Sequence, residues 1–149
     1  EQLRRLYARN HSAGHLLDIA MTKLGFDLKP GKGFHFPKGA YVEYVGNIEA
    51  DKREQTITDL NATVAELIEK NTEPVEVKVW DWEEAKANLD VPGYMPEGKP
   101  VRWIKLTPED AGCPCGGTHV KDIKDIGSLK VTKIQKKSKN VRVSYTVEQ

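Results

Sequence analysis

The sequence predicts an α+β fold in which a mainly antiparallel sheet packs against two long helices. Residues 1–24 and 51–71 carry apolar side chains at the spacing of three to four that is typical of an amphipathic helix. Near the C-terminus, the alternating sequences 128–135 and 141–148 flank the basic sequence KKSKN and predict a β-hairpin. Long helices that are interspersed with strands and end in a hairpin favour an antiparallel sheet over a parallel α/β repeat.

The first half of the chain divides into helix, loop, strand and helix. The helix over residues 1–24 is expected to stop at Gly25, because glycine readily takes the left-handed conformation that ends a helix. The Gly- and Pro-rich sequence 29–40 predicts a loop. The β-rich sequence 41–50 predicts a strand, and the second long helix over 51–71 follows. One face of that helix is formed by Ile57, Leu60, Val64, Leu67 and Ile68.

Residues 73–82 predict a half-buried strand. Val75, Val77 and Val79 occupy every second position there, which places them on one face of an extended chain. A short helix over residues 82–89 is expected to follow.

Composition and length indicate an ordinary globular domain. A chain of 149 residues fits a single domain, residues 1–149, that removes about 70% of the unfolded surface from solvent. Charged residues make up 30% of the chain but the net charge is only +1, so any RNA binding must depend on a local patch. There is no apolar run of about 20 residues and no secretory leader pattern, and a cytoplasmic location is expected. The chain begins at Glu1, which leaves open a further N-terminal domain.

A loop over 88–100 and a strand over 101–106 lead to the most unusual stretch of the chain, GCPCGGTHV at residues 112–120. Its cysteines, Cys113 and Cys115, are separated by one proline, and a disulfide across this spacing would be badly strained. The spacing also differs from the CxxC of redox pairs. A metal ligand or a plain thiol is the better interpretation.

Potential metal ligands occur as two pairs. His11 and His15 lie four residues apart on one face of the predicted first helix, although such a pair alone more often reflects polar packing. Ser12 occupies the position of the glutamate in zinc metalloproteases, which removes their general base. Cys115 and His119 are also four apart, with glycines between them that allow the backbone to turn, although a plain glycine-rich turn explains this pair equally well alone. Together, three imidazoles and one thiolate form a set suited to one Zn²⁺ ion per chain.

The order and spacing of three motifs resemble a known family. HSAGH in a helix, CGGTHV about a hundred residues later and DIGSLKVTKI after it are similar to the editing domain of alanyl-tRNA synthetases and the free-standing AlaX proteins. The resemblance extends from about Arg4 to the final hairpin. Threonyl-tRNA synthetases share a related editing fold but usually have proline before the histidine of the second motif. Thr118 therefore points to the alanyl branch.

This resemblance implies a trans-editing hydrolase. Such enzymes cleave the ester bond of mischarged Ser-tRNA(Ala), and in some cases Gly-tRNA(Ala), and release the amino acid and intact tRNA. By motif, the zinc ligands are His11, His15, Cys115 and His119. A zinc ion is expected to activate or position the water that attacks the ester. Four protein ligands normally form a closed structural site, so either the coordination expands or one ligand is loosely held.

Other residues near the motifs are candidates for further roles. The backbone N–H groups of Gly116 and Gly117 are candidate oxyanion donors. Relatives use a threonine after the first helix to select serine, and the sequence PGKGFHFP contains none. His35 and Thr118 are therefore the candidate substrate-pocket residues.

Two neighbouring side chains are expected to be less important. Asp18 lies one turn beyond His15 and is interpreted as an exposed helix carboxylate, with orientation of an imidazole as the alternative. Cys113 is interpreted as a packed thiol.

Basic residues gather in the predicted C-terminal hairpin, close in sequence to the motif. They are candidates for binding the phosphates of the acceptor end of tRNA(Ala), although lysines at a hairpin tip also serve solubility. A monomer that does not contact membranes is favoured. The candidate tRNA-binding residues are Lys130, Lys133, Lys136, Lys137, Lys139 and Arg142.

Three other functions compete with alanyl-tRNA editing. A zinc-stabilised RNA-binding module without catalysis would also explain a complete tetrahedral ligand set and a basic hairpin. A threonyl-type editing domain and another small-substrate metallohydrolase are the remaining alternatives.

Overall fold

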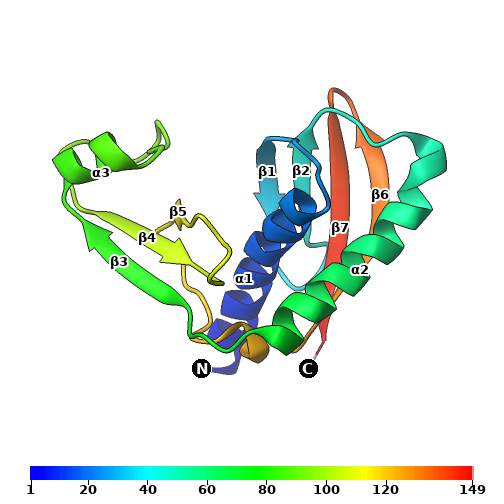
Figure 1. Ribbon diagram of the computed structural model, residues 1–149, viewed down its shortest axis with the longest axis horizontal. Coiled ribbons are helices and arrows are strands. Elements are labelled where there is room, and N and C mark those ends of the chain that lie inside the picture. Colours follow the sequence, from blue (N-terminus) through cyan, green and yellow to red (C-terminus); the bar gives the residue numbers. More distant parts are fainter. Residues whose placement is uncertain (149) are drawn as a thin grey trace.

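The computed structural model describes residues 1–148 as two antiparallel sheets and three α-helices (Figure 1). The predicted α+β class is therefore confirmed. The helices are α1 (Gln2–Lys23), α2 (Arg53–Lys70) and α3 (Trp82–Asn88), with short 3₁₀ turns at Ala50–Lys52 and Ile123–Ile126. The larger sheet has the order β1 (Pro30–Phe34), β2 (Tyr41–Val45), β7 (Asn140–Glu148) and β6 (Ser128–Lys137). The smaller sheet has the order β3 (Glu76–Trp80), β4 (Val101–Lys105) and β5 (Cys113–Pro114).

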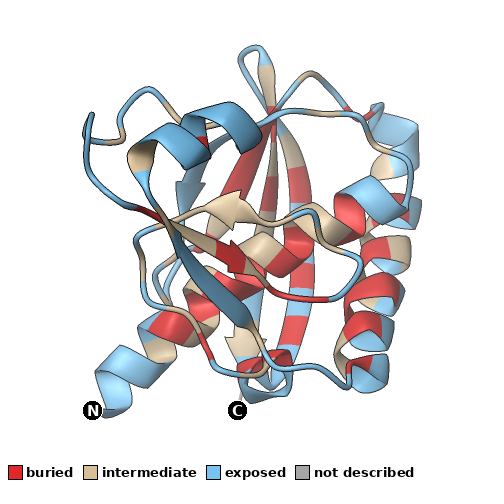
Figure 2. Ribbon diagram, turned by 60° about the vertical axis from the view of Figure 1, so that its left-hand side comes forward, coloured by how far each residue is buried: buried red, intermediate tan, exposed pale blue. Residues whose placement is uncertain are grey.

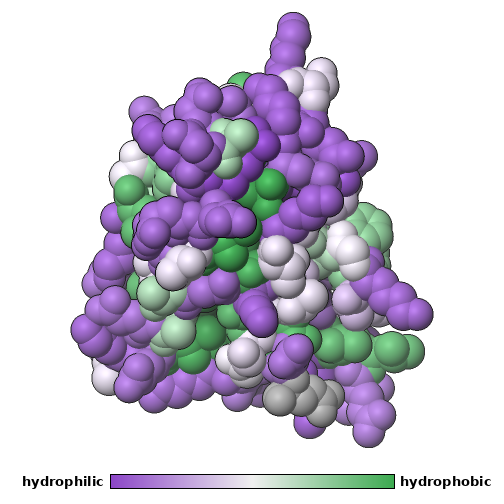
Figure 3. Space-filling model, turned by 90° about the vertical axis from the view of Figure 1, so that its right-hand side faces the viewer, coloured by the Kyte–Doolittle hydropathy of each residue, from purple (hydrophilic) through white to green (hydrophobic). Residues whose placement is uncertain are grey.

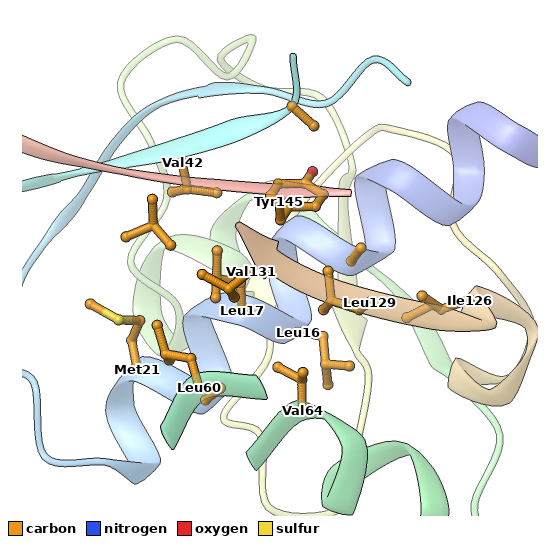
Figure 4. Packing of buried hydrophobic residues seen from close by; sticks show 14 of the residues in the cluster. Leu16, Leu17, Met21, Val42, Leu60, Val64, Ile126, Leu129, Val131 and Tyr145 are labelled. Atoms are coloured by element: carbon orange, nitrogen blue, oxygen red, sulfur yellow. The ribbon is translucent and has the colours of Figure 1, made fainter. Parts of the chain in front are cut away.

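The hydrophobic core lies between the larger sheet and the two long helices. Helices α1 and α2 cover one face of that sheet (Figure 1), and their buried residues face inward (Figure 2). Leu16 and Leu17 of α1 meet Leu60 and Val64 of α2 beneath the strands (Figure 4). Burying each such leucine contributes roughly 1.5–3 kcal/mol before the cost of chain ordering.

Helix α1 ends at Gly25 as predicted. Gly25 has a φ of +87°, and its N–H bonds the carbonyl of Thr22 while the N–H of Phe26 bonds that of Met21. This pair of bonds is a Schellman motif, which satisfies carbonyls that the helix leaves without partners. The chain therefore turns sharply away from the sheet and enters the segment before β1.

The segment 29–40 was predicted to be a loop, but it contains β1. Strand β1 pairs with β2 at the edge of the larger sheet, with an irregular register between Pro30 and Gly33. Proline lacks an N–H to donate, which an edge strand tolerates because one side of it is unpaired. Tertiary pairing with β2 thus overrides the local preference for a loop.

Strand β3 is present as predicted, but its valine face is not half-buried. Val77 and Val79 are 49% and 63% exposed. β3 is an edge strand of the smaller sheet, and α3 lies at its far end (Figure 1). The alternation of valines identified the strand correctly, but it could not show whether another element buries the valine face.

The C-terminal hairpin is longer than predicted. Its strands continue to Lys137 and Asn140, which are paired, so the turn consists of Ser138 and Lys139. Leu129, Val131 and Ile134 face the core, and the lysines point to solvent. Hydrophilic side chains dominate the side of the molecule that carries α2 and β6, with smaller apolar patches between them (Figure 3). Within the described residues, none of the helices has the length and apolar character needed to span a bilayer.

Candidate metal centre

Four side chains from distant parts of the sequence converge beside α1. One ligand atom from each of His11, His15, Cys115 and His119 lies within 4.8 Å of all the others. The first two come from α1, and the other two come from the segment after β5. The structure thus brings together the two pairs that the sequence analysis combined, and the cluster could hold a metal ion.

The spacing of the donor atoms fits zinc. Bond lengths of about 2.0–2.1 Å to nitrogen and about 2.3 Å to sulfur give a tetrahedron with N···N edges of about 3.4 Å and N···S edges of about 3.6 Å. The Nε2 atoms of His11 and His15 are 3.3 Å apart. The Cys115 sulfur lies 3.6 Å from the His11 Nε2 and 3.4 Å from the His119 Nε2. These three distances are close to the corresponding edges of a tetrahedral S₁N₃ site, and the four donor atoms all lie within 4.8 Å of one another.

Hydrogen bonds fix the ring orientation of two ligands. The Nδ1 of His11 lies 3.1 Å from the Thr118 carbonyl oxygen. A carbonyl can only accept, so Nδ1 carries the proton and the lone pair of Nε2 faces the cluster. The Nδ1 of His119 lies 3.0 Å from the Ser12 hydroxyl, which also accepts the Val120 N–H at 3.0 Å. The Thr118 carbonyl therefore holds His11 in the tautomer that a metal requires, and the Ser12 hydroxyl, which can donate or accept, orients the ring of His119.

Burial keeps the imidazoles neutral. Burial, followed by repulsion from His11, lowers the pKa of His15 to about 3. Burial, followed by repulsion from His15 and His11, lowers the pKa of His119 to about 2. Burial also lowers the pKa of His11. Metal ions bind neutral imidazole, so protons compete weakly for this site near neutral pH.

The two glycines of the motif have different roles. An added Cβ at Gly117 would lie 2.2 Å from the His11 Cε1, so this glycine lets the backbone approach the imidazole closely. A Cβ at Gly116 would have no other atom within 4 Å. Neither residue has a positive φ, so the need for glycine at Gly117 comes from the space that His11 occupies and not from a left-handed backbone. No hydrogen bond within residues 1–148 engages the N–H of either residue, which leaves both available as donors.

Cys113 and Asp18 lie near His15, and of the two only Asp18 differs from expectation. The Cys113 sulfur lies 3.4 Å from the Nδ1 of His15, so this thiol contacts the edge of the imidazole opposite to the Nε2 that faces the cluster. Burial raises the pKa of Cys113 to about 12, which keeps the thiol protonated. Asp18 is not an exposed carboxylate and has no hydrogen bond to an imidazole, because it accepts a 2.5 Å bond from the Tyr44 hydroxyl. Burial raises its pKa to about 6.

His35 lies next to the cluster. Its ring centroid is 5.4 Å from that of His11, and its Nδ1 is 2.7 Å from the Tyr145 hydroxyl. That hydroxyl donates to the Asn10 carbonyl, so His35 must donate from Nδ1 and keep a lone pair on Nε2. His35 and Thr118 both line a pocket of about 310 Å³ that also includes His11. Each of the two predicted pocket residues therefore borders the cluster.

The predicted basic residues do not form one group. Lys139, in the turn before β7, is six residues from Tyr145, which contacts His35 beside the cluster. Six residues of extended strand span about 20 Å, so Lys139 lies far from the cluster. Arg142 is engaged by Glu43 at 2.8 Å and lies over the Tyr41 ring. Lys130 and Lys133 lie further along β6 and are exposed. The other exposed lysines are Lys136 and Lys137 near the turn.

Sequence reasoning missed three residues that build this centre. Ser12 bridges α1 to the motif segment, and Tyr145 holds His35. The guanidinium of Arg102 in β4 donates to the Gly117 carbonyl. The only signal for Ser12 was its place between the two histidines, and long-range partners such as Arg102 and Tyr145 leave no local pattern.

Comparison with known proteins agrees with this centre. A family described as "Threonyl and Alanyl tRNA synthetase second additional domain" matches residues 101–142, which include Cys115 and His119. The chain is 31% identical over 139 residues to the alanyl-tRNA editing protein AlaX-L of Pyrococcus horikoshii, covering 91% of this chain and 32% of that protein. The resemblance to alanyl-tRNA editing proteins is confirmed.

Two further relatives match most of this chain. AlaX-M of Pyrococcus horikoshii is 32% identical over 133 residues, which cover 89% of this chain and 50% of that protein. The alanine–tRNA ligase of Anaeromyxobacter sp. is 29% identical over 150 residues, which cover 98% of this chain and 16% of the ligase. The chain thus spans about a third to a half of the length of the AlaX relatives.

Proposed function

We propose that this chain is a zinc-dependent aminoacyl-tRNA deacylase that hydrolyses mischarged Ser-tRNA(Ala) and, as a second substrate, Gly-tRNA(Ala). Residues 1–149 would act as one editing domain, on the acceptor end of the tRNA. The observation that carries this proposal is the convergence of His11, His15, Cys115 and His119 within 4.8 Å of one another beside a pocket in a chain similar to editing proteins.

A bound zinc ion would supply Lewis acidity, polarising the ester carbonyl and lowering the pKa of water. The chain's own residues orient the substrate. The free N–H groups of Gly116 and Gly117 border the cluster and are suited to hydrogen-bond the carbonyl oxygen as it gains negative charge. Since the ester is already an activated acyl group, this site needs less catalytic power than a peptidase.

His35 supports a preference for serine over alanine. The lone pair on its Nε2 accepts a hydrogen bond, and the Thr118 hydroxyl lies in the same pocket. A seryl hydroxyl would satisfy such a group, whereas an alanyl ester would leave it without a partner after desolvation. Burial, followed by repulsion from His11, lowers the pKa of His35 to about 4, so the imidazole stays neutral and keeps that acceptor.

The direct test is a deacylation assay on Ser-tRNA(Ala), Gly-tRNA(Ala) and Ala-tRNA(Ala) with the zinc-loaded protein. We expect hydrolysis of the seryl ester and retention of the alanyl ester. Cys115→Ala removes a ligand and should abolish turnover. Cys113→Ala is the matched control, because it removes a thiol two residues away that contacts only the back of His15. It should cost about 10-fold, as other losses of outer contacts to a metal ligand do.

A second candidate function is a zinc-stabilised RNA-binding module. Four potential protein ligands lie together, and four protein ligands are typical of structural zinc. Tight tRNA binding without ester hydrolysis would favour this module over the deacylase. Turnover of Ser-tRNA(Thr) in place of Ser-tRNA(Ala) would instead indicate a threonyl-type editing domain.

A further inference from the structure

A series of aromatic rings connects the metal cluster with the outer face of the larger sheet. Tyr7 of α1 meets Phe36 edge to face, with ring centroids 5.6 Å apart. Phe36 lies 5.0 Å from Phe34, and Phe34 stacks on Tyr41 at 5.8 Å with 15° between the ring planes. We call Tyr7, Phe36, Phe34 and Tyr41 the aromatic ladder.

The aromatic ladder is not part of the hydrophobic core. Tyr7, Phe34 and Phe36 are 44%, 37% and 52% exposed. By contrast, Tyr44 and Tyr145, which face the opposite side of the same sheet, are at most 2% exposed. Contiguous apolar side chains that remain in water indicate a binding surface.

One end of the aromatic ladder opens into the metal centre. Tyr7, Phe34 and Phe36 line the same pocket of about 310 Å³ as His11, His35 and Thr118. No acidic side chain lines this pocket. A ligand that stacks on the rings would therefore present its end to the cluster without meeting a negative charge.

A basic side chain follows the other end of the aromatic ladder. Cross-strand pairing aligns Phe34, Tyr41, Ser144 and Lys133 in one row across all four strands of the sheet. Neighbouring strands are about 4.8 Å apart, so the row leads from aromatic rings to a lysine within a few strand spacings. The guanidinium of Arg142 lies 3.9 Å from the centroid of the Tyr41 ring, but Glu43 compensates its charge, so Lys133 supplies the positive charge of the row.

We propose that the aromatic ladder binds the unpaired 3′ end of the RNA substrate by base stacking, and that Lys133 contacts its phosphate backbone. Aromatic side chains beside basic ones are the usual means of binding single-stranded RNA, because every base has a face that can stack. This inference rests on the proposed function for the identity of the substrate. It selects Lys133 over the lysines at the hairpin turn as the phosphate contact.

The test uses the zinc-loaded protein and a short single-stranded RNA with 2-aminopurine at its 3′ end, whose fluorescence falls on stacking. Phe36→Ala and Phe34→Ala should weaken RNA binding at least about 5-fold each and abolish the quenching. Phe36→Tyr should retain both, since it keeps an aromatic face. Phe36→Leu keeps apolar bulk without that face and should behave like the alanine variant. Tyr94→Ala, at a tyrosine that is 81% exposed in another loop, is the control and should change nothing.

Kinetics give an independent readout. On Ser-tRNA(Ala), Phe36→Ala should raise KM with little change in kcat, because stacking is the same in the ground state and the transition state. Lys133→Ala should raise KM and reduce its salt dependence, whereas Lys139→Ala should do neither.

The outcomes separate this inference from the proposed function. A protein that binds and quenches the RNA through Phe34 and Phe36 but hydrolyses no ester would support the aromatic ladder and refute the deacylase. Hydrolysis with unchanged RNA affinity and KM in both phenylalanine variants would overturn the aromatic ladder alone. If those variants instead abolish self-association without affecting RNA, the rings form a protein contact and the inference is wrong.

Discussion

The two halves of the metal cluster are held by different means. His11 and His15 belong to the regular helix α1, whose next turn carries Leu16 and Leu17 into the core. Cys115 and His119 follow a two-residue strand, and their segment is held mainly by side chains. The Ser12 hydroxyl forms hydrogen bonds with the His119 ring and the Val120 N–H. The His11 ring bonds the Thr118 carbonyl, and the Arg102 guanidinium bonds the Gly117 carbonyl.

This difference shows that the helical half serves as the template for the other half. Helix geometry alone places two imidazoles on one face, because residues four apart are about one turn apart. The motif segment has no such geometry of its own, and α1 supplies it through His11 and Ser12. We therefore expect substitutions in the motif segment and its contacts to affect the centre more than substitutions elsewhere on α1.

The largest effect is expected at Gly117. Gly117→Ala would place a methyl group 2.2 Å from a ring carbon of His11, so the imidazole or the segment has to move. Zinc affinity, measured by competition with a chromophoric chelator, should fall about 100-fold or more, since a ligand itself is displaced. Deacylation should fall in parallel.

Gly116→Ala is the matched control for Gly117. It adds the same methyl group one residue earlier, where no atom lies within 4 Å, and both variants keep the backbone N–H. Zinc affinity should stay within about 3-fold of the unmodified protein. Equal losses in the two variants would show that backbone freedom matters here, and the steric argument for Gly117 would then fail.

A smaller effect is expected at Ser12. Ser12→Ala removes the hydrogen-bond partner of the His119 imidazole and the acceptor of the Val120 N–H but leaves all four ligands in place. Loss of an outer contact to a metal ligand typically costs about 10–100-fold in affinity. Thr22→Ala is the control on the same helix, because its hydroxyl bonds only the Asp18 carbonyl of its own helix. Equal zinc affinity of the Ser12 variant and the control would contradict the template role of α1.

Much of the fold could be predicted from sequence because its signals are local. The helical stripes, the end of α1 at Gly25 and the C-terminal hairpin all follow from periodicity and turn chemistry within a few residues. The failures concern partners at long range. Strand β1 forms because β2 lies beside it, and Val79 stays exposed because no element covers the outer strand of the smaller sheet.

The four cluster residues could be found for a related reason. Metal chemistry restricts ligands to a few residue types, so two short pairs are visible even a hundred residues apart. Outer contacts have no such restriction. A serine, an arginine or a tyrosine can hold an imidazole or a carbonyl from any element, and Ser12, Arg102 and Tyr145 were therefore missed. The aromatic ladder was hidden likewise, because its rings come from α1, the segment around β1 and the start of β2 and form no local pattern.

The smallest effect is expected far from the cluster, at Glu43 on the outer face of the larger sheet. The hydrogen bond from Arg142, together with its charge, lowers the pKa of this carboxylate below its ordinary value. A lowered pKa means that the ion pair stabilises the protein fully above about pH 4.5, the ordinary glutamate value, and that this contribution is lost as pH falls through the lowered value.

Glu43→Gln should therefore lower the free energy of unfolding by about 1 kcal/mol near neutral pH, because Arg142 remains partly solvated. The difference between variant and parent should shrink as the pH falls, as measured by urea denaturation across the acid range. Zinc affinity at neutral pH should not change. Glu76→Gln, at an exposed carboxylate on β3, is the control and should give a flat difference. If the difference in free energy of unfolding between Glu43→Gln and the parent instead grows as the pH falls, folding does not lower the pKa of Glu43. The stabilising ion pair with Arg142 would then be refuted.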